Sequence, residues 1–337
     1  LNNLHNLEYP RRYWEILLYR WLWSYVIMIY DRWEAIRIVK KKNKKLTSRI
    51  FFYDKKKFIA NDSKEFSSSI MHSDDWNHWI YGEIFKFIGG IDYYFINKKK
   101  IQPKFIYKTG EYKSINYLVN SFSVLSSDRK IYSQNTYFSK RFQILYDLLN
   151  RQYKFRKEIF SKKVNIPIDT KARHNFIKLS KTKDKFARFA HSLIKYQLPR
   201  TYIEDYKHVQ KLIEKSNIIQ DPKIIITGID QQYNDIFKIF CAQKVLNGTK
   251  LFLLQHGGSY GVADFSPDEA LEIKISDKYL TWGWKHKNKK AIPFFLQKTA
   301  YKKIRKKKNA TGLILPLYEC YLTPSHPLYK GGPSNKM

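Results

Sequence analysis

Cysteine is scarce in this chain of 337 residues, which contains only Cys241 and Cys320. Both cysteines lie in apolar surroundings, and neither belongs to a Cys-x-x-Cys pair or to a set with the spacing of metal ligands. The scarcity excludes a disulfide framework, and it indicates a reducing compartment.

The chain also lacks the hydrophobic segments that direct a protein into a membrane. Residues 1–16 are polar and aromatic and do not resemble a signal peptide, and the first residue is leucine, so we expect a fragment of a longer protein. The most apolar stretch, ILLYRWLWSYVIMIY at residues 16–30, contains Arg20 and is too short for a spanning helix. We predict a buried helix there, with a membrane-skimming helix as the alternative.

Acidic residues are few: 29 Asp and Glu stand against 63 Lys and Arg, which gives a net charge of +34 and a pI of about 9.9. Such an excess favours a polyanionic partner, which is nucleic acid, an anionic membrane face or a phosphorylated substrate. The alternative source of the charge is the lysine-rich composition typical of an A+T-rich genome. The sequence contains no RRM, KH, zinc-finger or helix-turn-helix signature, so we expect no specific nucleic-acid partner.

Hydrophobic periodicity and capping residues predict many helices. One long helix is expected at residues 11–40, and another after Ser73, where acidic residues favour the helix N-terminus and Gly89 ends the helix. Further helices are predicted at residues 139–153 and 183–215, the latter broken near Pro199, and strands at residues 91–96 and 130–138.

The clearest pattern lies at residues 222–255. A β-branched run, KIIITGI, precedes a helical segment that Asn234 or Asp235 can cap and Gly248 ends, and a second apolar run, KLFLLQ, follows. A strand, a helix and a strand in this order predict a βαβ unit with two parallel, buried strands.

The second strand ends in HGGSYG, where His256 precedes Gly257, Gly258 and Gly261. Ligands of α/β sheets bind at the carboxyl ends of the strands. Glycines there permit a positive φ and close backbone approach to a ligand, and a histidine can exchange protons near neutral pH. The alternative is a glycine-rich connection with His256 hydrogen-bonded to the backbone. Neither the dinucleotide fingerprint G-x-G-x-x-G nor a P-loop is present.

Acidic residues gather after this loop. They are Asp264, Asp268, Glu269, Glu272 and Asp277, and the spacing of Glu269 and Glu272 puts both on one helix face. The following YLTWGW predicts a short strand, and TGLILPL at residues 311–317 predicts another after the lysine-rich residues 302–308.

Five segments, in this order, resemble a bacterial family of surface-carbohydrate transferases that was first defined from a Leptospira protein and whose members occur in O-antigen clusters. The segments are YWEILLYRWLWSYVIMIYDRWEAI, HSDDWNHWIYGEIF, LPRTYIEDY, DIFKIFCAQKVLNGTKLFLLQHGGSYG and SDKYLTWGW. The resemblance covers roughly residues 1–290. It implies an α/β fold of the GT-B glycosyltransferase type, in which two Rossmann-like domains face each other across a cleft.

The resemblance also implies a domain organisation and a set of site residues. We expect a Rossmann-like domain with a parallel sheet and many helices at residues 1–300, a basic linker at 301–310, and the start of a second, largely missing domain at 311–337. Among the residues themselves, His256 is the candidate base or donor contact, and Asp264, Glu269 and Asp277 are candidate catalytic carboxylates if His256 only positions the substrate. The candidate substrate-binding residues are Gln255, Gly257, Gly258, Ser259, Tyr260 and Gly261.

The function we expect is transfer of a sugar from a nucleotide-sugar to a glycan or lipid-linked acceptor in surface polysaccharide synthesis. The resemblance implies no metal and no cofactor beyond the nucleotide-sugar substrate. Basic surface would hold such a protein, from the cytoplasm, at the inner face of the membrane. The alternative is a basic protein without enzymatic activity that binds nucleic acid or an anionic membrane.

Overall fold

Helix α2, Arg11–Lys42, is the longest element of the computed structural model. The described residues are 1–43, 45–96, 131–149, 166–175, 182–215, 221–263 and 266–300. The apolar run at residues 16–30 forms the middle of α2, and Trp21, Tyr25 and Ile29 are buried. The predicted buried helix is therefore confirmed. In the part of the chain that is described, no helix has the length and apolar character needed to cross a membrane.

Five strands form a parallel sheet in the order β3-β4-β5-β6-β7. The strands are β3 Ile131–Gln134, β4 Ile224–Thr227, β5 Lys250–Leu254, β6 Lys278–Thr281 and β7 Ala291–Pro293. Between β4 and β5, helix α12, Asp235–Leu246, begins after Asn234, whose side chain accepts a hydrogen bond from the amide of Phe237. The predicted βαβ unit is confirmed.

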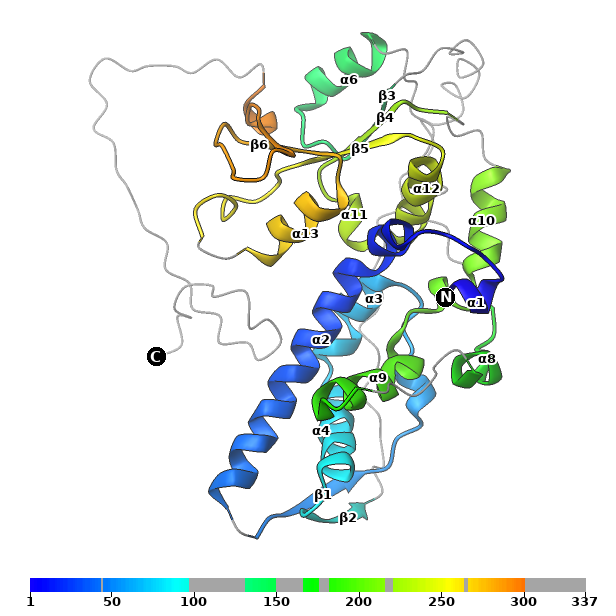
Figure 1. The fold of residues 1–337 in the computed structure, drawn as a ribbon, viewed down its shortest axis with the longest axis vertical. Helices are drawn as coiled ribbons and strands as arrows, with labels where there is room; N and C mark the ends of the chain where they lie inside the picture. The colour runs from blue at the N-terminus through cyan, green and yellow to red at the C-terminus, as the bar shows by residue number, and fades with distance from the viewer. Residues whose placement is uncertain are drawn as a thin grey trace, which may run out of the picture.

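The strand order follows the chain without reversal over the described strands. Right-handed crossovers in a single direction place successive helices on one face of a sheet. Helices α11, Asp230–Tyr233, α12 and α13, Pro267–Ile275, accordingly lie on the same side of the sheet, and α2 packs against all three (Figure 1). The order of the described strands does not reverse, so we expect a site along the carboxyl edge of the sheet.

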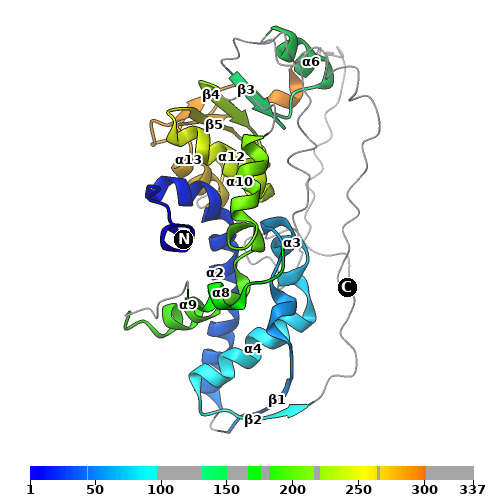
Figure 2. The ribbon, with the colours of Figure 1, turned by 90° about the vertical axis from the view of Figure 1, so that its right-hand side faces the viewer.

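Away from the large sheet, a helical region surrounds the second half of α2 and ends in a small parallel sheet (Figures 1 and 2). Its strands are β1 Thr47–Phe51 and β2 Asp92–Ile96, and its helices are α3 Ser63–Ser68, η2 Ile70–His72, α4 Asp74–Ile88 and α9 Lys185–Gln197. Ser73 caps α4 by accepting a hydrogen bond from the amide of Trp76, and Gly89 ends it with φ +67°. Both predicted ends of this helix are confirmed.

The remaining elements are short or peripheral. They are α1 Asn2–His5, η1 Lys55–Phe58, α6 Lys140–Leu149, α8 Thr170–Asn175, η4 Arg200–Tyr202, α10 Tyr206–Glu214 and η5 Gln297–Thr299. The predicted break near Pro199 separates α9 from α10. The predicted linker, the second domain and the strand at residues 311–317 lie outside the described residues.

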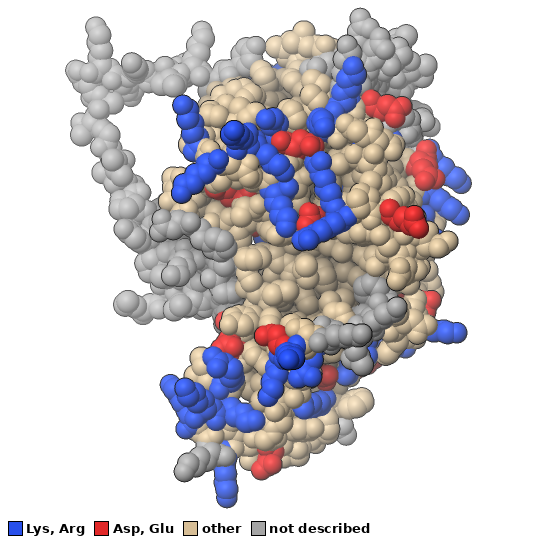
Figure 3. Space-filling view, viewed as in Figure 1, with Lys and Arg blue, Asp and Glu red and all other residues tan. Residues whose placement is uncertain are grey.

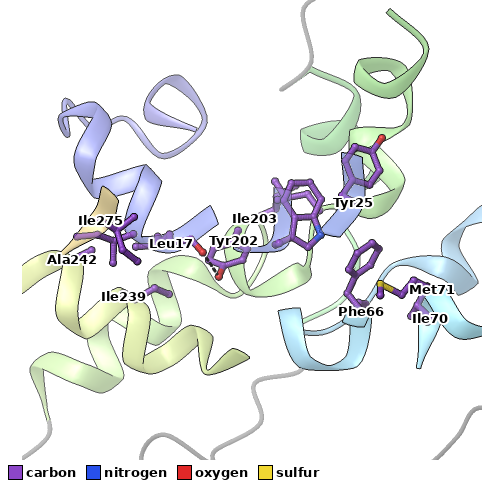
Figure 4. Close-up of a cluster of buried hydrophobic side chains, with 14 of the residues drawn as sticks. Leu17, Tyr25, Phe66, Ile70, Met71, Tyr202, Ile203, Ile239, Ala242 and Ile275 are labelled. Atoms are coloured by element: carbon purple, nitrogen blue, oxygen red, sulfur yellow. Dashed lines mark hydrogen bonds between the residues drawn. The ribbon is translucent and has the colours of Figure 1, made fainter. Parts of the chain in front are cut away.

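Basic side chains gather in two places in the view of Figure 3, over the upper part of the molecule, where the large sheet and its helices lie, and at the lower end. The interior is apolar, with one cluster of buried side chains from Tyr13 to Ala291. Figure 4 shows α2 at the centre of it, with Leu17 beside Ile239 of α12 and Ile275 of α13, and Tyr25 toward Phe66 of α3. Helix α2 therefore joins the sheet to the helical region through a continuous core.

A buried polar group reinforces this junction. The Lys238 cluster, which we define as Lys238, Asp235, Tyr202 and Ser63, connects α12 to η4 and α3. Lys238 Nζ lies 2.7 Å from Asp235 Oδ1, and Asp235 Oδ2 accepts a hydrogen bond of 2.7 Å from the Ser63 amide. The Tyr202 hydroxyl lies 2.7 Å from Asp235 Oδ1. Since each charge of the cluster has a partner, burial leaves none of them uncompensated.

Candidate active site

Three loops meet at the carboxyl edge of the large sheet. The loop after β3 contains Asn135 and Tyr137, and the loop after β4 contains Gly228 and Asp230. Asn135 Nδ2 donates to both carboxylate oxygens of Asp230, at 2.7 and 2.8 Å, and the Gly228 amide donates to the Asn135 carbonyl at 3.1 Å. A Cβ on Gly228 would lie 2.8 Å from the Tyr137 ring, so only glycine allows this approach. The third loop follows β5, which ends at Leu254, and His256 is its second residue.

His256 lies within a group of polar side chains from α11, α13 and its own loop. Its Nε2 is 3.0 Å from Glu272 Oε1, 2.9 Å from the Tyr260 hydroxyl and 2.9 Å from the Gln232 amide nitrogen. Gln231 and Gln232 also donate to Glu272 Oε1, at 2.9 and 3.0 Å. We call these five residues the His256 cluster. All the partners of the ring are side chains, which contradicts the alternative of a histidine bonded to the backbone.

The His256 cluster is buried but incompletely hydrogen-bonded. The side chain of His256 is 12% exposed and that of Glu272 is 4% exposed. Glu272 Oε2, Gln231 Oε1 and the Tyr279 hydroxyl are buried and form no well-aligned hydrogen bond with a described group. Tyr279 lies near Glu272, and burial together with this carboxylate raises the pKa of Tyr279. Burial of a polar atom without a hydrogen bond reduces the stability of the folded state. Several such atoms close together indicate a site that binds a ligand or transfers a proton.

The backbone beside the cluster is strained. Tyr137 has φ +62° and Asn135 has φ +46°, values that non-glycine residues rarely adopt. The Tyr137 ring lies parallel to His256, with centroids 6.3 Å apart and an interplanar angle of 19°. Burial, Asp230 and Glu272 raise the pKa of Tyr137. Strained residues concentrate at functional sites, where surrounding contacts hold them in place.

Arg20 brings a positive charge from α2 to the edge of the site. Its guanidinium forms an ion pair with Asp268 at the start of α13, and Nη2 donates to the Tyr233 hydroxyl at 2.9 Å. Burial raises the pKa of Asp268, while Arg20 opposes this rise. The arginine that interrupts the apolar run of α2 therefore meets an acidic residue of the candidate site.

Comparison with known protein families yields a match that covers residues 1–330 and is described as "LIC12162 family transferase". The chain belongs to this family. The resemblance deduced from five ordered motifs is thereby confirmed, and the protein is a transferase of this family. Comparisons with curated proteins and with solved structures gave no match.

In this transferase, Gln255 positions the loop, and both polar atoms of its side chain have protein partners. Its Oε1 accepts hydrogen bonds of 2.8 Å from the Trp282 amide and from Trp284 Nε1, and its amide nitrogen donates to the Gly257 carbonyl at 2.8 Å. The side-chain amide of Gln255 thus connects the loop after β5 to the loop after β6. The role of Gln255 in positioning the glycines was not deduced from the sequence.

The three glycines of the loop differ in what they require. Gly261 has φ +75°, and a Cβ on it would lie 2.5 Å from the Trp284 ring. Gly257 and Gly258 have no positive φ, so of these three glycines only Gly261 adopts the conformation that glycine permits. A Cβ on Gly258 would meet nothing within 4 Å. Gly258 and the exposed Ser259 are thus the parts of the loop open to a ligand.

The predicted carboxylates separate into two groups. Glu269 lies beside the loop, where its Oε2 accepts a hydrogen bond of 2.7 Å from the Gly261 amide. Asp277 lies at the opposite, amino edge of the sheet, because it precedes β6. It accepts hydrogen bonds of 2.7 Å from Arg12 and 2.8 Å from the Leu251 amide. The structure therefore does not bring Asp277 together with His256, and Asp264 lies outside the described residues.

Several residues of the site were missed from the sequence. Glu272 was recognised as acidic and on the same helix face as Glu269, which is confirmed, but it was not assigned to the site. Tyr137, Asp230 and Gln232 carry no sequence signal of their own. The position of Asp230 directly after the predicted strand KIIITGI was an available indication, whereas Tyr137 lies within the strand predicted at residues 130–138. In the described part of the chain, no three His, Cys, Asp or Glu side chains are close enough to hold a metal ion.

Proposed function

We propose that this transferase moves a sugar from a nucleotide-sugar to a hydroxyl of a glycan or lipid-linked acceptor during surface polysaccharide synthesis. The fold we propose for the whole enzyme is GT-B, with the parallel sheet described above as one of its two Rossmann-like halves. The observation that carries the proposal is His256, held by a buried carboxylate at the carboxyl edge of a parallel sheet, beside an open glycine.

In the proposed reaction His256 is the general base. It takes the proton of the acceptor hydroxyl as that oxygen forms a bond to the anomeric carbon. The bond between the anomeric carbon and the phosphate oxygen breaks, and the nucleotide leaves with the electron pair. Base catalysis of this kind contributes about 10²–10⁴-fold to a rate.

Glu272 would set the protonation of the ring. A carboxylate only accepts hydrogen bonds, so it favours a proton on the nearby Nε2. With the proton there, the Gln232 amide donates to Glu272 Oε1 and not to the ring. The Nδ1 atom, which has no hydrogen bond to the described residues, then keeps the lone pair that a base needs. When the ring gains a proton, the negative charge of Glu272 stabilises the imidazolium.

Positive charge beside the site would stabilise the leaving phosphate. Lys298 Nζ lies 4.9 Å from the centre of the Tyr137 ring, which in turn lies parallel to His256. The open backbone at Gly258 offers a further approach for phosphate oxygens. We propose that no metal or additional cofactor is needed, because lysine and backbone amides would balance the charge of the leaving group.

The proposal is tested with a panel of UDP-, GDP-, dTDP- and CMP-sugars, by measuring nucleotide release with and without added glycan acceptors. We expect release from one nucleotide class, and we expect His256→Ala to lower the rate about 10²–10⁴-fold. The matched control is His208→Ala, which removes an exposed histidine of α10. An undiminished rate in His256→Ala, with the protein still folded, would remove His256 from the mechanism. Transfer from acyl or sulfate donors alone would overturn the proposed substrate class.

A further inference from the structure

The end of the molecule farthest from the large sheet has an unusual surface. We define this distal tip as the last turns of α2, the C-terminal end of α4, and strands β1 and β2, which lie together in both views (Figures 1 and 2). Lys40 connects the two helices by donating to the Gly89 carbonyl at 2.6 Å, and the Asp92 amide donates to the Leu46 carbonyl at 2.9 Å. The tip is therefore a continuous surface.

Large apolar and aromatic side chains are exposed at the tip. They are Ile38, Val39, Phe52, Phe87, Tyr93, Tyr94 and Phe95. Phe52 is 72% exposed and Phe95 is 53% exposed, although burial of such a side chain is worth about 1.5–3 kcal/mol. Isolated apolar residues are normal on a protein surface, but a concentrated group marks an interaction site.

Basic residues surround these side chains. The exposed ones are Lys41, Lys42, Lys45, Arg49, Lys56 and Lys57. Within the described residues, no carboxylate forms an ion pair with Lys41, Lys42 or Lys45. Figure 3 shows the resulting predominance of basic side chains at the lower end of the molecule. The surface thus combines positive charge with aromatic and aliphatic groups.

We infer that the distal tip binds the surface of an anionic lipid bilayer. Lysines attract anionic headgroups, and phenylalanine, tyrosine and aliphatic side chains enter the boundary between headgroups and acyl chains. A single-stranded nucleic acid fits the tip less well. Tyr93 and Phe95 lie on one face of β2 and Tyr94 on the other, because side chains alternate along a strand, so the aromatic rings offer no continuous stacking platform.

The tip is separate from the candidate active site. Along α2, Arg20 and Lys41 are about 30 Å apart at 1.5 Å per residue. Membrane binding therefore does not rest on the proposed sugar transfer, and each can fail without the other. Turnover on a soluble acceptor should not change when the tip is altered.

The test is flotation of the full chain with vesicles of phosphatidylcholine, alone or mixed with phosphatidylglycerol. We expect binding to the anionic vesicles that weakens as salt is added. Lys41→Gln with Lys42→Gln should weaken it about 25-fold, since each lysine contributes about fivefold at such a surface. Phe52→Ser with Phe95→Ser should weaken it about tenfold or more.

Two double variants provide matched controls. Lys287→Gln with Lys289→Gln removes two exposed charges near the large sheet, and Ile144→Ser with Leu148→Ser removes two exposed apolar side chains of α6. We expect both controls to bind within twofold of the unaltered chain. Equal losses in the controls and the tip variants, or no loss in the tip variants, would overturn the inference. Binding of single-stranded RNA that only the tip variants lose, without vesicle binding, would assign the tip to nucleic acid instead.

Discussion

Two buried polar clusters of the protein resemble each other in composition and differ in completeness. The Lys238 cluster and the His256 cluster each combine one carboxylate with a nitrogen base and hydroxyl-bearing or amide side chains. In the Lys238 cluster, both oxygens of Asp235 have hydrogen-bond partners at 2.7 Å. In the His256 cluster, Glu272 Oε2 has none among the described residues.

This difference separates a structural role from a functional one. A buried network in which every polar atom has a hydrogen-bond partner fixes how its elements pack. A network that leaves polar atoms without partners lowers the stability of the fold, and it is retained where it serves a function. The Lys238 cluster lies where α2, α3 and α12 join, within the core. The His256 cluster lies at the carboxyl edge of the sheet, beside the strained Tyr137 and the open Gly258.

The largest effect expected is on turnover, from Glu272→Gln. The amide can no longer favour a proton on Nε2 of His256 as a carboxylate does, so we expect the rate to fall about 10²–10⁴-fold. The free energy of unfolding should change by less than about 1 kcal/mol, because the variant removes a buried charge with an unsatisfied oxygen. Rate and denaturant unfolding are measured on the same preparation. A large loss of stability at a normal rate would make the His256 cluster structural.

For Asp235→Ala we expect a large loss of stability and little change in turnover. Removing this carboxylate leaves Lys238 buried without its counter-charge, and we expect a loss of about 3–5 kcal/mol in unfolding free energy. Turnover per folded molecule should stay within about twofold of the unaltered protein. The double variant Asp235→Leu with Lys238→Met removes both charges, and it should be more stable than Asp235→Ala. Urea unfolding of the three proteins checks this order, and an equal loss in all of them would contradict the role of charge pairing.

Within the loop, Gly261→Ala and Gly258→Ala should differ. The first places a Cβ at positive φ against Trp284, and we expect it to lose about 1–3 kcal/mol of stability. The second meets open space in an ordinary conformation, so stability should stay within about 0.5 kcal/mol. Thermal and urea unfolding distinguish the two. Gly258→Val should still lower turnover by blocking approach of the ligand, and normal turnover in that variant would show that the ligand does not approach the backbone there.

The smallest effect is expected at Asp277. Burial alone would raise the pKa of Asp277, but hydrogen bonds from Arg12 and the Leu251 amide outweigh it and lower this pKa. A lowered pKa in the folded state stabilises above the pKa of the unfolded chain, and the contribution disappears as the pH falls through the folded value. Asp277→Asn should therefore lose less than about 1 kcal/mol at pH 7, and the difference should shrink below about pH 4. A strongly reduced rate in this variant would return Asp277 to the list of catalytic candidates.

Local sequence was sufficient to predict several elements of the fold. The capped helix after Ser73, the buried middle of α2 and the βαβ unit ending at Gln255 depend on neighbouring residues: a capping side chain, an apolar period and β-branched runs. The sequence also predicted that Gly257 and Gly258 lie in a loop at the carboxyl end of a parallel strand. It did not determine their φ angles, because a glycine permits a positive φ without requiring it.

Ordered motifs and short-range patterns thus determined the family, the parallel α/β character and the place of His256 after the second strand of the βαβ unit. Only the tertiary structure decided which residues act with it. Glu272 reaches His256 because α13 packs under the carboxyl edge, while Asp277, five residues later, lies at the amino edge beside Arg12. The physical reason is the geometry of a parallel sheet. Each strand carries the chain to the carboxyl edge and each connecting helix, such as α13, returns it to the amino edge, so residues close in sequence separate and residues from distant loops meet.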